Sequence, residues 1–220
     1  IKTIMIKVKK FTFNPFQENT YIISNEKKEC IIIDPGCSNL NEEKEINFYI
    51  ENSNLSPKYL LNTHCHIDHI LGNNFIKSNW DVKFGIHKLE NELLKNSKII
   101  ADNYGIENFK ESPKPDFFIQ ENQVIEIFEL KFKTISCPGH SPGHILFYEE
   151  NKEIMFSGDL IFKNSIGRYD LPGSDYQTLC NSLRKVCLIE KNVKIYSGHG
   201  PITTLDIEKK MNPFILQIHQ

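Results

Sequence analysis

The sequence has no long hydrophobic segment. None of its apolar stretches approaches the roughly 18 uninterrupted residues that mark a membrane-spanning helix. The first residues, IKTIMIKVKKFTF, lack the apolar core followed by small residues that is typical of a secretory signal. We therefore expect a protein with no membrane span, no membrane partner and no visible export signal.

Cys-x-x-Cys pairs are also absent, although the chain holds six cysteines. A chain of 220 residues can bury a core without disulfide bonds to hold it together. Reduced thiols in a cytoplasm are the simplest interpretation, so we expect a cytoplasmic location. The cysteines are Cys30, Cys37, Cys65, Cys137, Cys180 and Cys187.

Glycine and proline, 11 and 10 residues, are too few for a collagen-like or low-complexity chain. The net charge is −2, which argues against a dedicated nucleic-acid binder, and we expect no nucleic-acid partner. The length favours one domain, and no linker rich in Pro, Gly or Ser divides the chain. We therefore expect a single domain over residues 1–220, and the oligomeric state stays open.

Short strand-like and helix-like segments recur along the chain, which predicts an α+β sandwich whose sheet is covered by helices. The periodicity leaves open whether there are one or two sheets. The predicted strands are residues 4–8, 21–24, 30–34, 59–61, 82–86, 124–128, 130–136, 145–148, 154–156 and 193–196. The predicted helices are residues 41–52, 70–78, 87–96, 176–186 and 203–211, and residues 103–116 predict a loop.

The segment THCHIDH carries the strongest chemical signal. Three imidazoles and one carboxylate fall within its last six residues, directly after a short apolar run. Imidazole and carboxylate together suit zinc, iron or manganese. The residues are His64, His66, Asp68 and His69. A cluster of solvated or capping histidines is the alternative, and matching residues downstream weigh against it.

Those downstream residues are His140 in CPGHSPGH, Asp159 in FSGDLIF and His199 in YSGHGP. Each follows an apolar, strand-like run and lies beside a glycine, which lets the backbone turn sharply and approach closely. A single catalytic zinc needs three protein ligands and an open position. Seven candidate ligands are therefore too many for one such ion and enough for two.

At this point the chain resembles the metallo-β-lactamase superfamily. THCHIDH matches the family motif H-x-H-x-D-H, and Asp34, His140, Asp159 and His199 follow in the expected order. The chain looks most like the small, single-domain relatives of glyoxalase II, the hydroxyacylglutathione hydrolase-like proteins. The resembling segments are NPFQENTYII, IIIDPG, CPGHSPGH, SGDLIFKNSIGRYDLPGSD and SGHGPITTLDIEKKMNPF.

The resemblance implies a four-layer αββα sandwich with the metal site at one edge. It implies two divalent metal ions per chain, zinc first, with iron or manganese as alternatives. One ion would be held by His64, His66 and His140, and the other by Asp68, His69 and His199. Asp159 would bridge the two ions.

The resemblance also gives Asp34 and Asp68 further roles. Asp34 matches a family aspartate that orients a ligand histidine, and the same residue suits the turn at Pro35-Gly36. Asp68 would be a ligand that could also handle a proton. Two ions about 3.5 to 4 Å apart can share a water and lower its pKa towards 7. The expected reaction is therefore attack on a substrate carbonyl by a hydroxide that bridges the ions.

Arg168 and Tyr169, in GRYDLPG, are the candidate substrate-binding residues. Arg168 could grip a substrate carboxylate, and the alternative is an ion pair with Asp170 or another acid. Two residues close to the candidate ligands in sequence, Cys65 and His144, also have purely structural interpretations. Cys65 alternates with its ligand neighbours along an extended segment, so it should point into the core. His144 suits either support of a ligand or a structural hydrogen bond.

One departure from glyoxalase II bears on the substrate. The helical domain that binds glutathione there has no room here, because only 21 residues follow His199. We expect a hydrolase for a small acyl thioester such as S-lactoylglutathione, or for an ester. The main alternative is a persulfide dioxygenase with a single iron. An RNase Z-type nuclease, a β-lactamase and a non-catalytic metal-binding module are weaker alternatives.

Overall fold

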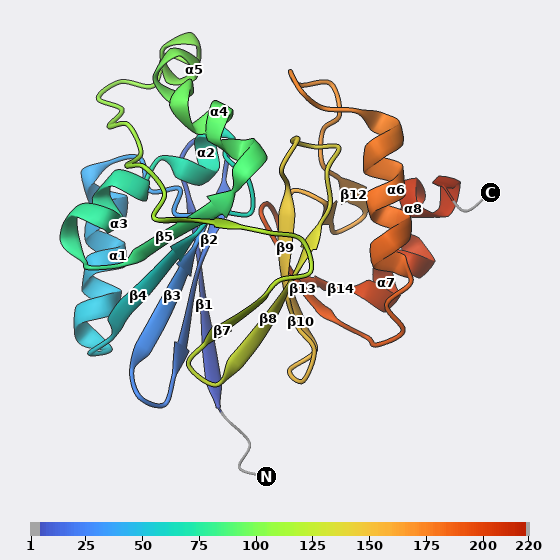
Figure 1. The fold of residues 1–220 in the computed structure, drawn as a ribbon, viewed down its shortest axis with the longest axis horizontal. Helices are drawn as coiled ribbons and strands as arrows, with labels where there is room; N and C mark the ends of the chain where they lie inside the picture. The colour runs from blue at the N-terminus through green and yellow to red at the C-terminus, as the bar shows by residue number, and fades with distance from the viewer. Residues whose placement is uncertain (1–4, 219–220) are drawn as a thin grey trace. The chain divides into compact units, whose positions relative to one another are not determined.

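The computed structural model describes residues 5–218, so the first residue of the first predicted strand lies outside the described residues. The described chain forms two compact units (Figure 1). The first unit comprises residues 5–86 and 91–118, and the second comprises residues 87–90 and 119–218. Each unit is built on one six-stranded sheet, which answers the question that the periodicity left open.

The first sheet has its strands in the order β1-β2-β3-β4-β5-β6. The strands are β1 (Ile6–Phe13), β2 (Glu18–Asn25), β3 (Glu29–Ile33), β4 (Ser56–Leu61), β5 (Lys83–His87) and β6 (Phe117–Ile119). β1, β2 and β3 pair antiparallel, whereas β3, β4 and β5 pair parallel. The carboxyl ends of β3, β4 and β5 therefore lie at one edge of the sheet.

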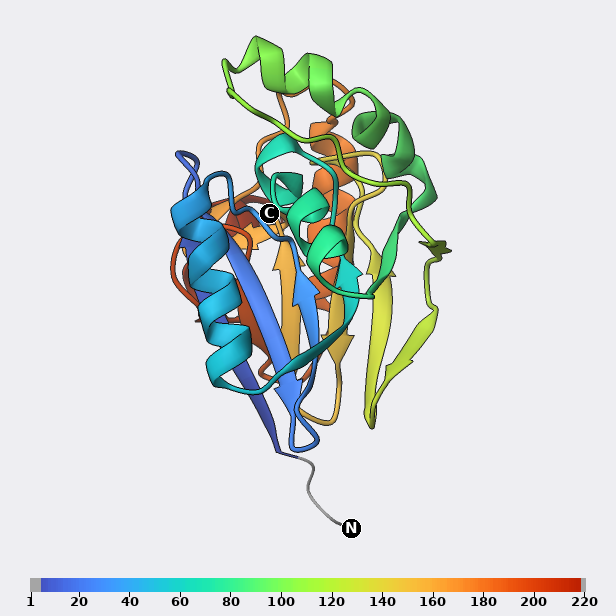
Figure 2. The same cartoon turned by 90° about the vertical axis from the view of Figure 1, so that its left-hand side faces the viewer.

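The described part of the first unit also contains five helices. They are α1 (Leu40–Asn52), α2 (Ile67–Ile70), α3 (Asn73–Asn79), α4 (Asn91–Lys95) and α5 (Ser97–Asn103). The Asn39 side chain caps α1 by accepting from the backbone N–H groups of Asn41 and Glu42. Ile46 and Ile50, four residues apart on α1, pack in the apolar core of this unit together with sheet residues. Figure 2 shows α1 and α3 across the same face.

The second sheet has the order β14-β13-β10-β9-β8-β7. Its strands are β7 (Val124–Ile127), β8 (Leu130–Ser136), β9 (Ile145–Glu149), β10 (Ile154–Gly158), β13 (Lys194–Ser197) and β14 (Thr203–Thr204). A small hairpin pairs β11 (Ile161–Phe162) with β12 (Ser165–Ile166). β10 and β13 are parallel, and the other neighbours in the main sheet are antiparallel.

The helices of the second unit pack on its sheet through one apolar cluster. They are α6 (Tyr176–Cys187), α7 (Leu205–Met211) and α8 (Pro213–Ile218). The short η1 (Lys88–Glu90) also belongs to this unit but contributes no residue to the cluster. α6 contributes Leu179, Leu183 and Val186, spaced on one face of the helix, and all three are fully buried. Each unit is thus a sheet with a helical layer on one face.

Two predicted helices differ from the structure. The helix expected over residues 70–78 corresponds to α3, which begins only at Asn73 and is separate from α2, because the chain passes very close to a neighbouring loop at Gly72. The Gly72 N–H donates to the Pro35 carbonyl at 2.7 Å, and a Cβ at Gly72 would lie 2.4 Å from the Cys37 sulfur. The helix expected over residues 87–96 begins later, since His87 ends β5 and α4 starts at Asn91.

Some elements are missing from the sequence prediction. The helices α2, α5 and α8 and the short strands β6, β11, β12 and β14 were not expected. β14 takes the first two residues of the helix predicted over residues 203–211, so α7 begins at Leu205. α8 has a recognisable start, because Asn212 accepts from the Phe214 N–H and Pro213 occupies the first turn. Within residues 5–218, no helix combines the length and the apolar character needed to cross a membrane.

The packing of α6 gives a stability prediction. Leu183→Ala should lower the free energy of unfolding by about 2–5 kcal/mol, because it leaves a cavity at a fully buried position. The matched control is Leu188→Ala at the end of the same helix, where the side chain is 80% exposed. The control should change the free energy by less than about 0.5 kcal/mol. Chemical denaturation of both variants measures the difference, and equal effects would contradict the packing described here.

Candidate metal centre

The first unit brings together four of the predicted ligands at the carboxyl end of β4. His64 and His66 lie in the extended segment after the strand, and Asp68 and His69 lie in α2. The His64 ring centroid lies 4.8 Å from that of His66 and 4.2 Å from that of His69. The His69 Nε2 is 3.6 Å from an Asp68 carboxylate oxygen. His64 and His69 are buried, whereas His66 and Asp68 are partly exposed.

Asp34 supports this group from the neighbouring strand end. It follows β3 directly and adopts φ +48°, a left-handed conformation that aspartate tolerates better than most residues. One carboxylate oxygen accepts from the Thr63 N–H at 2.7 Å. The other accepts from the Thr63 hydroxyl at 2.6 Å and lies 3.1 Å from the His69 Nδ1. By accepting these hydrogen bonds, the Asp34 carboxylate fixes the orientation of the His69 ring, a candidate ligand.

These hydrogen bonds assign the tautomers of two histidines. A carboxylate can only accept, so the His69 Nδ1 carries the proton that it donates to Asp34. The Thr63 hydroxyl has one hydrogen, which it donates to Asp34. Its oxygen must then accept from the His64 Nδ1, which is 3.1 Å away. Both histidines therefore present the lone pair of Nε2 for coordination.

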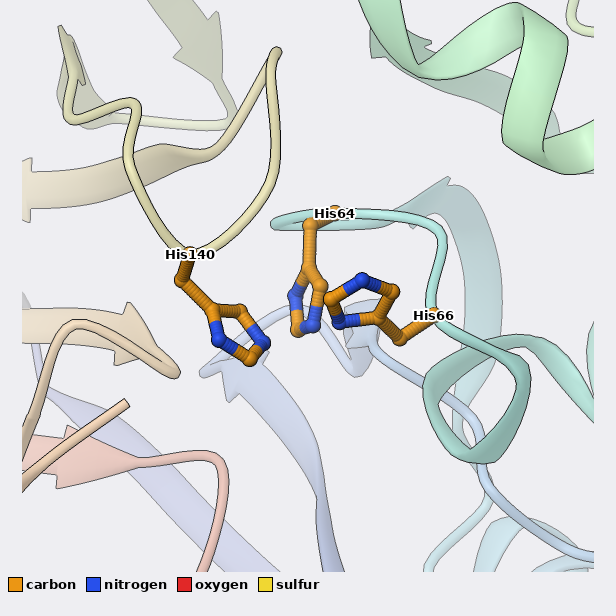
Figure 3. A group of neighbouring side chains, drawn as sticks. All are labelled: His64, His66 and His140. Carbon is orange, nitrogen blue, oxygen red and sulfur yellow. The ribbon is translucent and has the colours of Figure 1, made fainter. Parts of the chain in front are cut away.

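The second unit brings together the other three predicted ligands. His140 lies in the loop between β8 and β9, Asp159 directly follows β10, and His199 follows β13. β10 and β13 are parallel and β9 is antiparallel to β10, so these three segments meet at one edge of the sheet. An Asp159 carboxylate oxygen lies 3.5 Å from the Nε2 of His140 and 3.5 Å from the Nε2 of His199. Figure 3 draws His140, together with His64 and His66 of the first unit.

His140 is held in the same manner as the histidines of the first unit. Its Nδ1 donates to the backbone carbonyl of Arg168 at 2.8 Å, which leaves the lone pair on Nε2. His144 does something different, because its Nε2 accepts from the backbone N–H of Asp159 at 3.1 Å. The structure thus shows His144 as a fully buried hydrogen-bonding residue that fixes the backbone of a predicted ligand.

Close backbone approach is needed around Asp159 and His140. A Cβ at Gly167 would lie only 1.9 Å from the Asp159 carbonyl oxygen. Gly139 has φ +128°, and a Cβ there would lie 2.3 Å from the backbone nitrogen of Leu179. Any side chain at either position would displace the ligand beside it, so glycine is required.

The candidate substrate residues lie on the surface of the second unit. Arg168 forms a two-pronged ion pair with Asp170, with both distances 2.9 Å and both side chains 64% exposed. The arginine lowers the pKa of the Asp170 carboxyl below its usual value through these hydrogen bonds. The ion pair with Asp170 that the sequence offered as an alternative is thus present in the structure. Tyr169 is exposed and its ring contacts that of Tyr176, with centroids 4.6 Å apart.

Cys65 lies where the alternation along the segment predicted it. Its side chain is 1% exposed and packs in the apolar core of the first unit. Cys65 also belongs to none of the clusters of candidate metal ligands found among the described residues.

Sequence reasoning missed three residues around the ligands. Thr63 could have been found as a hydroxyl directly before the first ligand. Glu18 is fully buried near Asp34 and Asp68, and burial is the main reason that its pKa is raised well above the usual value. Glu90 is also fully buried, but in HKLENELLK it resembles an ordinary solvated charge, so no sequence signal distinguishes it.

The donor set in each unit suits divalent metal ions. Imidazole nitrogens and carboxylate oxygens are the ligands that zinc and iron take in proteins. Three histidines have Nδ1 occupied by a protein acceptor and Nε2 left to coordinate, namely His64, His69 and His140. A hydrogen bond of this kind makes the ring a better ligand and fixes its orientation.

Asp34→Asn tests whether the Asp34 carboxylate positions the candidate ligand His69. An amide has one accepting oxygen and a donating NH2 in place of the other, so it cannot keep all three bonds, from the Thr63 N–H, the Thr63 hydroxyl and the His69 ring. We expect metal affinity to fall about ten- to hundredfold, as for other residues that orient ligands. Competition with a coloured chelator measures the affinity. Cys65→Ser is the control and should keep its metal, and unchanged affinity in Asp34→Asn would contradict the assigned role.

Asp159→Ala tests whether the carboxylate that lies between the candidate ligands His140 and His199 takes part in metal binding. The variant should lose or bind more weakly at least one ion, and its catalytic activity should collapse. Elemental analysis of the purified variant, with the wild type prepared in parallel, measures the metal. A variant that retains the full metal content and activity would refute the role given to Asp159.

Known proteins are similar to this chain in sequence and in fold. The family model of the metallo-beta-lactamase superfamily matches residues 13–199. The hydroxyacylglutathione hydrolase GloC of Haemophilus influenzae is 35% identical over 202 residues, covering 91% of this chain and 93% of the relative.

Two solved structures extend this likeness to the fold. TTHA1623, solved in a di-iron-bound form, has a TM-score of 0.84 at 33% identity, over 94% of this chain and all of that one. The B3 metallo-beta-lactamase BLEG-1 has a TM-score of 0.84 at 30% identity, over 96% and 99% of the two chains. The α+β metallo-β-lactamase fold expected from the sequence is confirmed. The chain belongs to the metallo-beta-lactamase superfamily.

Proposed function

We propose that this protein is a dinuclear metal-dependent hydrolase that cleaves a small acyl thioester such as S-lactoylglutathione. The observation that carries the proposal is the place of Asp159, 3.5 Å from the Nε2 atoms of both His140 and His199. A carboxylate that faces two ligand histidines in this way suits a bridge between two ions.

The proposed assignment of ligands follows from this bridge. His64, His66 and His140 would hold one ion, and Asp68, His69 and His199 would hold the other. When bound, a pair of zinc ions supplies an activated water near neutral pH and polarises the substrate carbonyl. Iron or manganese in place of zinc would suit the same imidazole and carboxylate donors.

The chain's own residues prepare the site for this chemistry. Asp34 and Thr63 fix the rings of His64 and His69, so these rings need little reorganisation when a metal ion binds. The Asn14 side chain donates to the Asp68 carbonyl at 3.0 Å, which holds the start of α2. Asp68 keeps a partly exposed carboxylate that can take up a proton as the reaction proceeds. Cys65, packed in the core, contributes no nucleophile.

The thioester substrate is supported by the relatives. GloC is named a hydroxyacylglutathione hydrolase, and the alignment covers nearly all of both chains. The relative that carries this name is thus one that the alignment covers almost completely. Arg168 and Tyr169 are the proposed contacts to the substrate, and Arg168 would have to exchange Asp170 for a substrate carboxylate.

A β-lactam substrate is the second candidate, because the similar structure BLEG-1 is named a B3 metallo-beta-lactamase. The third candidate is a persulfide dioxygenase with one iron, which the family resemblance also allows. All three activities can be measured on one preparation of the protein, so one panel of substrates separates them.

The test is a comparison of S-lactoylglutathione, a chromogenic cephalosporin and glutathione persulfide. We expect hydrolysis of the thioester, loss of the activity after treatment with a chelator, and its return when zinc is added. Asp159→Ala is the control for adventitious metal catalysis and should be inactive. Cephalosporin cleavage without thioester cleavage would favour a β-lactamase, and oxygen uptake with the persulfide would favour the dioxygenase.

A further inference from the structure

A four-residue segment departs from the unit that surrounds it in sequence. Residues 87–90 belong to the second unit, while the residues on both sides belong to the first. Glu90 is the last residue of this segment and is fully buried. A buried carboxylate is costly unless hydrogen bonds compensate it, so its partners indicate why the segment lies there.

Glu90 bonds the loop that carries His140. One of its carboxylate oxygens accepts from the Ser141 hydroxyl at 2.9 Å and from the Gly143 N–H at 2.6 Å. Both donors are buried, and they flank Pro142 in the loop between β8 and β9. The approach is close, because a Cβ at Gly143 would lie 3.0 Å from both the Cγ and the backbone nitrogen of Glu90.

The carbonyl groups of the same loop are held by other residues of the second unit. The Ser182 hydroxyl donates to the Pro138 carbonyl at 2.6 Å, and the Asp175 N–H donates to the Gly139 carbonyl at 2.8 Å. The Ser174 hydroxyl donates to the His140 carbonyl at 2.7 Å. Glu90 complements these bonds. It accepts hydrogen bonds from donors of the loop, whereas Ser174, Asp175 and Ser182 donate hydrogen bonds to its carbonyl groups.

We propose that Glu90 is a positioning residue for His140 and sets the affinity of the ion that His140 helps to hold. The inference rests on the proposed function, in which His140 is a ligand. The His140 ring is fixed at Nδ1 by the Arg168 carbonyl, but its backbone position depends on the loop. Without Glu90, two buried donors lose their acceptor and the loop can relax away from the ligand position.

The experiment measures metal affinity of three variants by competition with a coloured chelator, with zinc as the probe. Glu90→Ala removes the acceptor, and one of the two ions should bind about ten- to hundredfold more weakly. Glu90→Gln retains an oxygen that can accept both bonds, so it should keep affinity near that of the wild type. Rescue by this variant separates the hydrogen bonds from the negative charge.

Glu149→Ala is the matched control. Glu149 is also a buried carboxylate that accepts from a loop, with its oxygen 2.5 Å from the Lys152 N–H, but it lies at the opposite end of β9 from His144. The control should lower the melting temperature without changing zinc affinity. If Glu90→Ala does not fold, Ser141→Ala removes one of the two bonds and must itself weaken zinc binding.

The outcomes separate this inference from the function on which it rests. A wild type that binds fewer than two ions would count against the proposed dinuclear site. A wild type with two ions, together with unchanged affinity in Glu90→Ala, would overturn the role of Glu90 alone. Equal loss of affinity in Glu90→Gln and Glu90→Ala, or in Glu149→Ala and Glu90→Ala, would also overturn it.

Discussion

The buried carboxylate of Asp34 is the interaction on which the first half of the metal centre depends. It accepts hydrogen bonds from the backbone and the hydroxyl of Thr63 and from the ring of His69. The sheet explains its position, because β3 and β4 are parallel neighbours and the Asp34 N–H donates to the Leu61 carbonyl at 3.0 Å. The pairing of two strands thus determines where the first histidines point.

The second unit also holds its candidate ligands in place with buried hydrogen bonds, but other groups form them. A backbone carbonyl, that of Arg168, takes the place of the carboxylate as the acceptor for a ligand histidine. His144 holds the backbone of Asp159, and Glu90 bonds the loop that carries His140. In both units the candidate ligands follow a strand end, on loops or, for Asp68 and His69, in the short helix α2. Buried hydrogen bonds give these segments the precision that coordination requires.

The candidate ligands could be picked out from the sequence because their chemistry is concentrated in short segments. THCHIDH places several ligands in one loop, and the alternation that turns Cys65 inward follows from extended backbone. The separation of α2 from α3 could not be predicted, since it depends on the contact of Gly72 with Pro35 and Cys37. Glu90 escaped notice for a similar reason: its partners are more than fifty residues away in sequence.

The central claim is that this chain holds two metal ions through seven side chains, and metal content tests it most directly. The protein should be purified without added metal and its metal per chain measured by elemental analysis. The account predicts about two ions per chain, as zinc or a mixture of zinc and iron. One iron per chain and little else would contradict the dinuclear site and support the dioxygenase instead.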